Sequence, residues 1–211
     1  TSSVFGAVVD IGTTTLVASL VDLSTGSEIA CESSLNPQAT IAQDVLSRIK
    51  YGSEPTGLFR LKDMLIIEIN RMISAMCDNA RIERHHIYEA VFSGNTCMLH
   101  LASGVNPAPL GKYPFIPGWT GGRIARASEI GLSISTFGSV YCPPNISAYV
   151  GADITSGILT SRLHENDDTV LFIDIGTNGE MALSVKGKIC ASSTAAGPAF
   201  EGMNIEFGMR A

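Results

Sequence analysis

The chain has 211 residues, of which 45% are hydrophobic and 16% charged, and its formal net charge is −6 at pH 7. This length fits one large domain or two small ones with a substantial core. The negative charge argues against a nucleic-acid partner, and no apolar run approaches the roughly 18 residues that a membrane span needs. The five cysteines form no C-x-x-C pattern, which argues against an iron–sulfur or metal-finger site and predicts buried, reduced thiols in a cytoplasmic protein.

The first 34 residues predict a three-stranded meander. Its first strand ends in the stretch VVDIGTTT at 8–15, a second apolar run follows, and Ser24-Thr25-Gly26 marks the next turn. Asn36-Pro37 then ends the meander, because a residue that precedes proline avoids the helical region.

Two helices are predicted next, over 40–50 and 57–79. The apolar face of the first consists of Ile41, Val45, Leu46 and Ile49. The second has apolar side chains every three or four positions, so its methionines are interpreted as core residues. His85-His86 is interpreted as a solvated turn and not as a metal site, because no third ligand lies nearby in the sequence.

The stretch from 87 to 101 predicts a buried strand, the turn Ser93-Gly94-Asn95-Thr96 and a short helix. A strand followed by a glycine turn and a helix N-terminus places ligands at the carboxyl edge of an α/β sheet. An alternative with equal support is an ordinary strand–helix turn in which Asn95 or Thr96 caps the helix.

Residues 105–136 contain many prolines and glycines and predict a long irregular segment. Such a segment in a compact domain is often functional, and here it includes the single tryptophan and two arginines, so we expect a protein interface. The alternative is an extended loop packed on the sheet.

A strand at 139–142 and a helix over 147–163 complete the first part of the chain. Gly151 and Gly157 inside this helix predict close packing or a hinge, because glycine lowers helix stability by roughly 1 kcal/mol relative to alanine. Asp153 either reaches a ligand cleft or favours the helix N-terminus through the helix dipole.

The turn after the first strand occurs a second time. Residues 172–180, with the sequence FIDIGTNGE, match 8–15, and in both copies a second apolar strand, a turn and a third strand follow. Self-similarity of this kind predicts two duplicated halves that close on one ligand. Two ordinary hairpins with Asp–Gly turns are the alternative.

The residue types in these turns suit a phosphate and a cation. Gly12 and Gly176 let the backbone approach a ligand, and threonine hydroxyls with turn N–H groups form an anion-binding concavity. Asp10 and Asp174, at the ends of their strands, are placed to hold a cation through water.

This layout resembles the superfamily of actin, sugar kinases and heat-shock chaperone ATPases. Residues 10–15 and 174–180 match its two phosphate motifs, 147–163 its first connecting helix, and 196–202 its glycine-rich turn. Within the superfamily, DIGTTT, SGNT, YPFIP and FIDIGTNGE resemble the reductive activators of corrinoid proteins.

The resemblance implies an α/β, actin-like (ribonuclease H-like) fold with a mixed sheet flanked by helices. It implies a first ATPase subdomain at 1–165 and the start of a second, incomplete one at 166–211. It also implies that ATP with Mg²⁺ drives the reduction of Co(II) to Co(I) in a partner corrinoid protein, and that the activator forms a homodimer. The 2Fe-2S cluster of that family belongs to a domain absent from this chain, and so does its downstream adenosine-binding region.

In this interpretation, Asp10 and Asp174 are catalytic, orient the water ligands of Mg²⁺, and one of them positions the attacking water. The residues expected to bind the nucleotide are Gly12, Thr13, Thr14, Thr15, Gly94, Asn95, Gly176, Thr177, Asn178, Gly179, Glu180 and Gly197. Two other functions remain open, a small-molecule kinase of the same fold and a scaffold that binds nucleotide without turnover.

Overall fold

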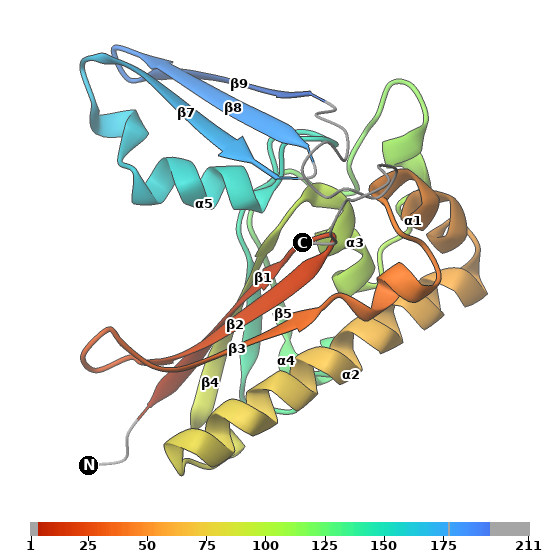
Figure 1. Cartoon of the computed structure of the whole chain (residues 1–211), viewed down its shortest axis with the longest axis vertical. Coiled ribbons are helices and arrows are strands. Elements are labelled where there is room, and N and C mark those ends of the chain that lie inside the picture. Colours follow the sequence, from red (N-terminus) through yellow and green to blue (C-terminus); the bar gives the residue numbers. More distant parts are fainter. Residues whose placement is uncertain (1–3, 177, 195–211) are drawn as a thin grey trace, which may run out of the picture.

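Two sheets form the framework of the computed structural model, which describes residues 4–176 and 178–194 (Figure 1). The larger sheet has the strand order β3-β2-β1-β4-β6-β5 and the smaller one the order β7-β8-β9. The strands are β1 (Phe5–Ile11), β2 (Thr15–Asp22), β3 (Ser27–Leu35), β4 (Ile87–Gly94), β5 (Arg123–Arg126), β6 (Ser139–Cys142), β7 (Thr169–Ile175), β8 (Gly179–Val185) and β9 (Lys188–Thr194).

The larger sheet is mixed. β1 pairs antiparallel with β2 and parallel with β4, and β4 pairs parallel with β6. The smaller sheet is an antiparallel meander. The α/β fold with a mixed sheet and two similar meanders is therefore confirmed.

Five α-helices and four short 3₁₀ turns connect the described strands. The helices are α1 (Val45–Gly52), α2 (Pro55–Ala80), α3 (Thr96–Ser103), α4 (Ala127–Ile130) and α5 (Ala152–Thr160), and the turns are η1 (Pro37–Thr40), η2 (Arg84–His86), η3 (Ala108–Gly111) and η4 (Leu163–Glu165). None of the described helices is long and apolar enough to cross a membrane.

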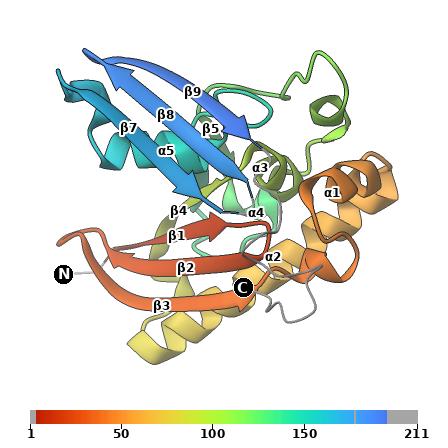
Figure 2. The ribbon, with the colours of Figure 1, turned by 45° about the horizontal axis from the view of Figure 1, so that its top comes forward.

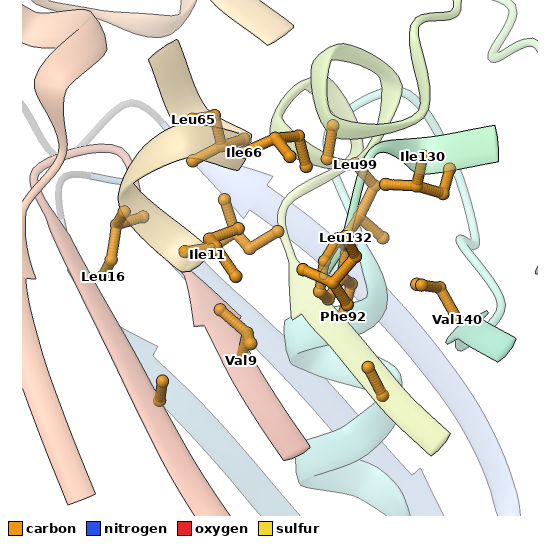
Figure 3. Packing of buried hydrophobic residues seen from close by; sticks show 14 of the residues in the cluster. Val9, Ile11, Leu16, Leu65, Ile66, Phe92, Leu99, Ile130, Leu132 and Val140 are labelled. Atoms are coloured by element: carbon orange, nitrogen blue, oxygen red, sulfur yellow. The ribbon is translucent and has the colours of Figure 1, made fainter. Parts of the chain in front are cut away.

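The long helix α2 supplies much of the main core. It begins with Pro55 at its first turn, where a missing N–H is harmless, and ends at Arg81, which has a left-handed backbone. Met72 and Met76 are fully buried, as predicted. Figure 3 shows Leu65 and Ile66 of α2 facing Ile11 and Leu16, beside the turn between β1 and β2.

The prediction for the first helix was wrong at its start. The helix begins at Val45 and not at residue 40, because Asp44 caps it: the Asp44 side chain accepts a hydrogen bond from the Ser47 N–H at 2.8 Å. Ile41 lies before the helix, and Leu46 is 65% exposed, so neither belongs to its buried face.

The helix predicted over 147–163 is also shorter, because α5 starts only after Gly151. Ser147 and Val150 form an isolated bridge instead. The segment 105–136 is less irregular than predicted, since β5 pairs with β6 at the sheet edge and α4 follows directly. The local sequence does not show that β5 is a strand, because its pairing partner β6 lies later in the chain.

The cysteine prediction holds for Cys77, Cys97 and Cys142, which are buried free thiols. It is wrong for Cys31 and Cys190, which are exposed on β3 and β9. Alternate side chains of a strand point to opposite faces, and these two lie on faces that the described residues leave uncovered.

Helix α5 connects the two sheets, and its glycines explain how closely it approaches them. A Cβ on Gly157 would lie 2.6 Å from the Phe172 ring, and one on Gly151 would lie 2.6 Å from the Asn95 Cα. The close packing predicted for these glycines is therefore confirmed. A second small core of Val150, Ile154, Leu163 and Ala182 lies under the smaller sheet. The division of the chain at 165/166 stays a prediction.

Candidate functional site

The first candidate turn, residues 12–14, joins β1 to β2 and is held from the interior. Asn36 Nδ2 donates a hydrogen bond to the Gly12 carbonyl at 2.8 Å, and Arg48 Nη2 donates one to the Thr13 carbonyl at 2.6 Å. A Cβ on Gly12 would lie 2.4 Å from the Thr15 carbonyl oxygen. Glycine is therefore required here for the tight return of the chain, as well as for any close approach of a ligand.

The turn between β4 and α3 lies directly beside the first one. Gly94 has a φ of +150°, and a Cβ there would lie 2.6 Å from the Ile11 carbonyl oxygen. Asn95 caps α3 by accepting a hydrogen bond from the Met98 N–H at 3.0 Å, and it donates another to Thr13 Oγ1 at 3.1 Å. Asn95 is therefore a helix cap that also contacts the first turn, and its role toward a ligand stays a prediction.

The second candidate turn joins β7 to β8 with the same hairpin topology. Gly176 N–H donates a hydrogen bond to the Asn178 carbonyl at 3.0 Å, and Asp174 stands opposite Glu180 in the strand register. Thr177 and Gly197, both predicted to bind nucleotide, lie outside the described residues.

Figure 2 shows the ends of β1 and β7 pointing toward the same region of the molecule. Electrostatic coupling between Asp10 and Asp174 supports this arrangement: partial burial and, secondly, the charge of Asp174 raise the pKa of the Asp10 carboxyl. Helix α5 contacts β4 of the larger sheet and β8 of the smaller one, with Ser156 Oγ 3.3 Å from Ser93 Oγ on β4. The repeated motifs therefore meet in space.

Two further carboxyl groups, those of Asp153 and Glu180, interact electrostatically with this pair. Burial raises the pKa of Asp153 to about 6, with added contributions from the charges of Asp174 and Asp10. Burial also raises the pKa of Glu180 to about 7, with the charge of Asp153 second, while a hydrogen bond from Ser193 Oγ at 3.2 Å acts in the opposite direction. Asp153 lies in the first turn of α5, which agrees with a favourable interaction with the helix N-terminus, and its reach into a ligand cleft stays a prediction.

The acidic cluster, defined as Asp10, Asp153, Asp174 and Glu180, suits a hydrated cation. Burial and, secondly, mutual repulsion raise the pKa values of Asp10, Asp153 and Glu180, and a divalent cation that prefers oxygen ligands would offset the repulsion. Within 4–176 and 178–194, however, no group of three or more His, Cys, Asp or Glu residues is arranged to hold a metal directly. Carboxylates at strand ends are residues that can hold Mg²⁺ through its water ligands.

Sequence reasoning missed Asn36 and Arg48, which hold the first turn from below. Asn36 carries no sequence signal beyond its position before Pro37, at the predicted end of the meander. Arg48 lies on a short helix, where an arginine is ordinarily a solvated residue, yet it is fully buried.

Two family models match the chain. One is described as the RACo middle region and matches residues 5–166; the other, matching 168–211, is described as the C-terminal domain of RACo, the ASKHA domain. The chain belongs to the RACo family. A curated relative is the corrinoid activation enzyme RamQ of Eubacterium limosum, which is 36% identical over 208 residues, 98% of this chain and 35% of that protein.

Another curated relative is the Co(II) methylated amine-specific corrinoid protein reductase of Methanosarcina barkeri, 39% identical over 90 residues, which are 42% of this chain and 17% of that protein. Among solved structures, a reductive activator for a corrinoid, iron-sulfur protein superposes with a TM-score of 0.93 at 41% identity, covering 100% of this chain and 34% of that one. This chain of the RACo family thus spans about a third of the length of RamQ and of the solved reductive activator.

A likeness in fold alone extends to a 2-dehydro-3-deoxygalactonokinase-type protein from Sinorhizobium meliloti. Its TM-score is 0.54 at 12% identity, over 95% of this chain and 57% of that chain. The match of 168–211 to an ASKHA domain agrees with the superfamily that the two turn motifs indicated.

Proposed function

We propose that this chain is part of the ATP-hydrolysing unit of an activator that couples ATP to the reduction of Co(II) to Co(I) in a partner corrinoid protein. Membership of the RACo family supports this proposal, as do the names of the relatives, which refer to corrinoid activation and to reduction of a Co(II) corrinoid protein. The electron would come from an iron–sulfur cluster outside this chain, as the family resemblance implies.

The observation that carries the proposal is the approach of Asp10 to Asp174. These residues occupy equivalent positions in two copies of one motif, and the charge of Asp174 contributes, after burial, to the raised pKa of Asp10. Ordinary hairpins in unrelated parts of a fold have no reason to bring their aspartates together. A ligand held between two phosphate turns requires this arrangement.

The roles of the side chains follow from this geometry. The N–H groups and hydroxyls of the 12–15 turn would hold one side of the β- and γ-phosphates, with Gly94 and Asn95 next to them, and residues 176–179 would hold the other side. Asp10 and Asp174 would bind water ligands of Mg²⁺. Mg²⁺, when bound, neutralises charge on the phosphates during transfer.

A proton acceptor is needed for the attacking water. In the protein without nucleotide and metal, burial raises the pKa of Asp153 to about 6 and that of Glu180 to about 7, near neutral pH, which is the range where a general base is most effective. We assign this role to the pair, with Asp153 on α5 placed to respond when the two sheets move relative to each other. Such a movement would carry the effect of hydrolysis to the surface that meets the corrinoid protein.

Calorimetry of Mg·ATP binding tests the proposal first, on the 211-residue chain and on the full-length protein. We expect the full-length protein to bind Mg·ATP and to release phosphate, with faster release when the Co(II) corrinoid partner is added. Binding without phosphate release would favour the scaffold function, and phosphate transfer to a sugar or acid would favour a kinase. Absence of binding by the full-length protein would overturn the proposal. The homodimer stays a prediction that sedimentation of the same sample would check.

A further inference from the structure

Arg48 is a fully buried arginine at the end of the first turn of α1, and it contacts the 12–14 turn. Its guanidinium donates hydrogen bonds to the Thr13 carbonyl at 2.6 Å, to the Ala42 carbonyl at 2.9 Å and to Met98 Sδ at 3.0 Å. These acceptors are all uncharged. A side chain that is ordinarily exposed is thus held inside the protein, where one of its three hydrogen bonds fixes the turn.

No carboxylate of residues 4–176 or 178–194 forms a salt bridge with the Arg48 guanidinium. The Asp44 carboxylate, which acts on Arg48 only through its charge, is exposed and caps α1. Burial lowers the pKa of Arg48 to about 10, so the guanidinium is still protonated at neutral pH. A buried charge that no carboxylate of the described residues pairs is costly to keep, and it contributes a positive potential at the turn.

Peptide geometry then determines where the turn's donors point. In a trans peptide, the N–H of one residue points opposite to the carbonyl of the residue before it. Asn36 and Arg48 hold the Gly12 and Thr13 carbonyls toward the interior, so the Thr13 and Thr14 N–H groups point the other way. Neither of these N–H groups donates to a backbone carbonyl within 4–176 and 178–194.

We propose that Arg48 is the positioning residue of the first phosphate turn, and that its buried charge is balanced by the phosphates of a bound nucleoside triphosphate. The inference rests on the proposed function. Arg48 acts through the turn in two ways: it orients the Thr14 N–H by fixing the Thr13 carbonyl, and its charge attracts the polyphosphate through a poorly screened interior. The effect should grow with the number of phosphates on the ligand.

The test compares Arg48→Met and Arg48→Lys with the matched control Gln38→Met in the full-length protein. Gln38 is also fully buried, and its Nε2 donates to the Leu61 carbonyl at 3.0 Å and not to a carbonyl of the turn. Calorimetry would measure the Kd values for Mg·ATP and for AMP, and thermal unfolding would measure the stability of each variant.

We expect Arg48→Met to weaken Mg·ATP binding about tenfold and AMP binding much less. Arg48→Lys should recover most of the affinity, because it keeps the charge. Gln38→Met should lower stability and leave both Kd values unchanged. Equal losses for ATP and AMP, or equal losses in Arg48→Met and Arg48→Lys, would show a purely structural role and overturn the inference.

A measurement on the unchanged protein covers the case in which Arg48→Met does not fold. In ¹⁵N-arginine-labelled protein, the buried Arg48 guanidinium should give a slowly exchanging signal that shifts when a non-hydrolysable ATP analogue binds. If the signal does not shift while the analogue binds, the inference about Arg48 is wrong but the proposed function is unaffected. If the wild-type protein binds no nucleotide at all, the proposed function fails first.

Discussion

Asn95 Nδ2 donates a hydrogen bond to Thr13 Oγ1 at 3.1 Å, which ties the turn before α3 to the turn between β1 and β2. These residues are 82 positions apart in the chain. The parallel pairing of β4 with β1 places Gly94 opposite Ile11, so the two turns leave the sheet at the same level. The capping residue of a helix thus also orients a hydroxyl of the candidate phosphate site.

Replacement of Asn95 separates these two roles. Asn95→Ala removes the cap and the bond to Thr13, and should lower the unfolding free energy by about 1–2 kcal/mol. Asn95→Ser keeps a capping oxygen but is too short to reach Thr13, so stability should change little while Mg·ATP binding weakens several-fold. Urea unfolding and calorimetry on both variants check this. Wild-type affinity in Asn95→Ser would mean that the bond to Thr13 is dispensable for binding.

Asp174 provides the most direct test of catalysis. Asp174→Asn keeps the shape of the side chain but removes the charge proposed to hold the Mg²⁺ waters, so phosphate release and ATP-dependent activation should fall at least about 100-fold. Asp168→Asn, an exposed position just before β7, is the matched control and should retain activity. Unchanged activation in Asp174→Asn would remove this residue from the mechanism.

Glu180 makes stability depend on pH in the nucleotide-free protein. Its pKa is raised from 4.5 to about 7, chiefly by burial, so the folded state binds more protons than the unfolded state between these values. The unfolding free energy therefore falls as pH rises through this window. Glu180→Gln removes the effect and should be more stable than wild type at pH 8 by about 2–3 kcal/mol, with no difference at pH 4.

Urea unfolding at a series of pH values measures this difference. The control is Glu28→Gln, an exposed position on β3, for which the difference from wild type should stay within about 0.5 kcal/mol at every pH. A Glu180→Gln variant whose stability follows that of wild type from pH 4 to pH 8 would contradict the assignment of an elevated pKa to this carboxyl.

Gly94 tests the contact between β4 and the first turn. Gly94→Ala places a methyl group 2.6 Å from the Ile11 carbonyl oxygen at a φ of +150°, so the unfolding free energy should fall by about 2–4 kcal/mol. Gly121→Ala is the control, because a Cβ there meets nothing within 4 Å. Thermal unfolding of the two variants compares them directly. Equal stability would show that the β4 turn can move away from β1 freely.

Features that depend on neighbouring residues could be predicted from the sequence. Each DIGT turn is flanked by two strands that pair with each other, so the hairpins and their repetition followed from local pattern alone. The apolar side chains that recur every three or four positions in α2 likewise predicted its buried face, including Met72 and Met76. The starts of helices were less predictable. Asp44 and Gly151 are the N-cap residues of α1 and α5, and the periodicity of apolar residues does not reveal where a cap lies.

The sequence alone therefore determined the two candidate turns, the aspartates at their strand ends and the superfamily they indicate. Only the tertiary structure decided that these aspartates meet, that Asp153 and Glu180 join them with raised pKa values, and that Arg48 lies buried under the first turn. The physical reason is range: hydrogen bonds within a turn depend on a few adjacent residues, whereas burial and electrostatic coupling depend on which distant segments the fold brings together.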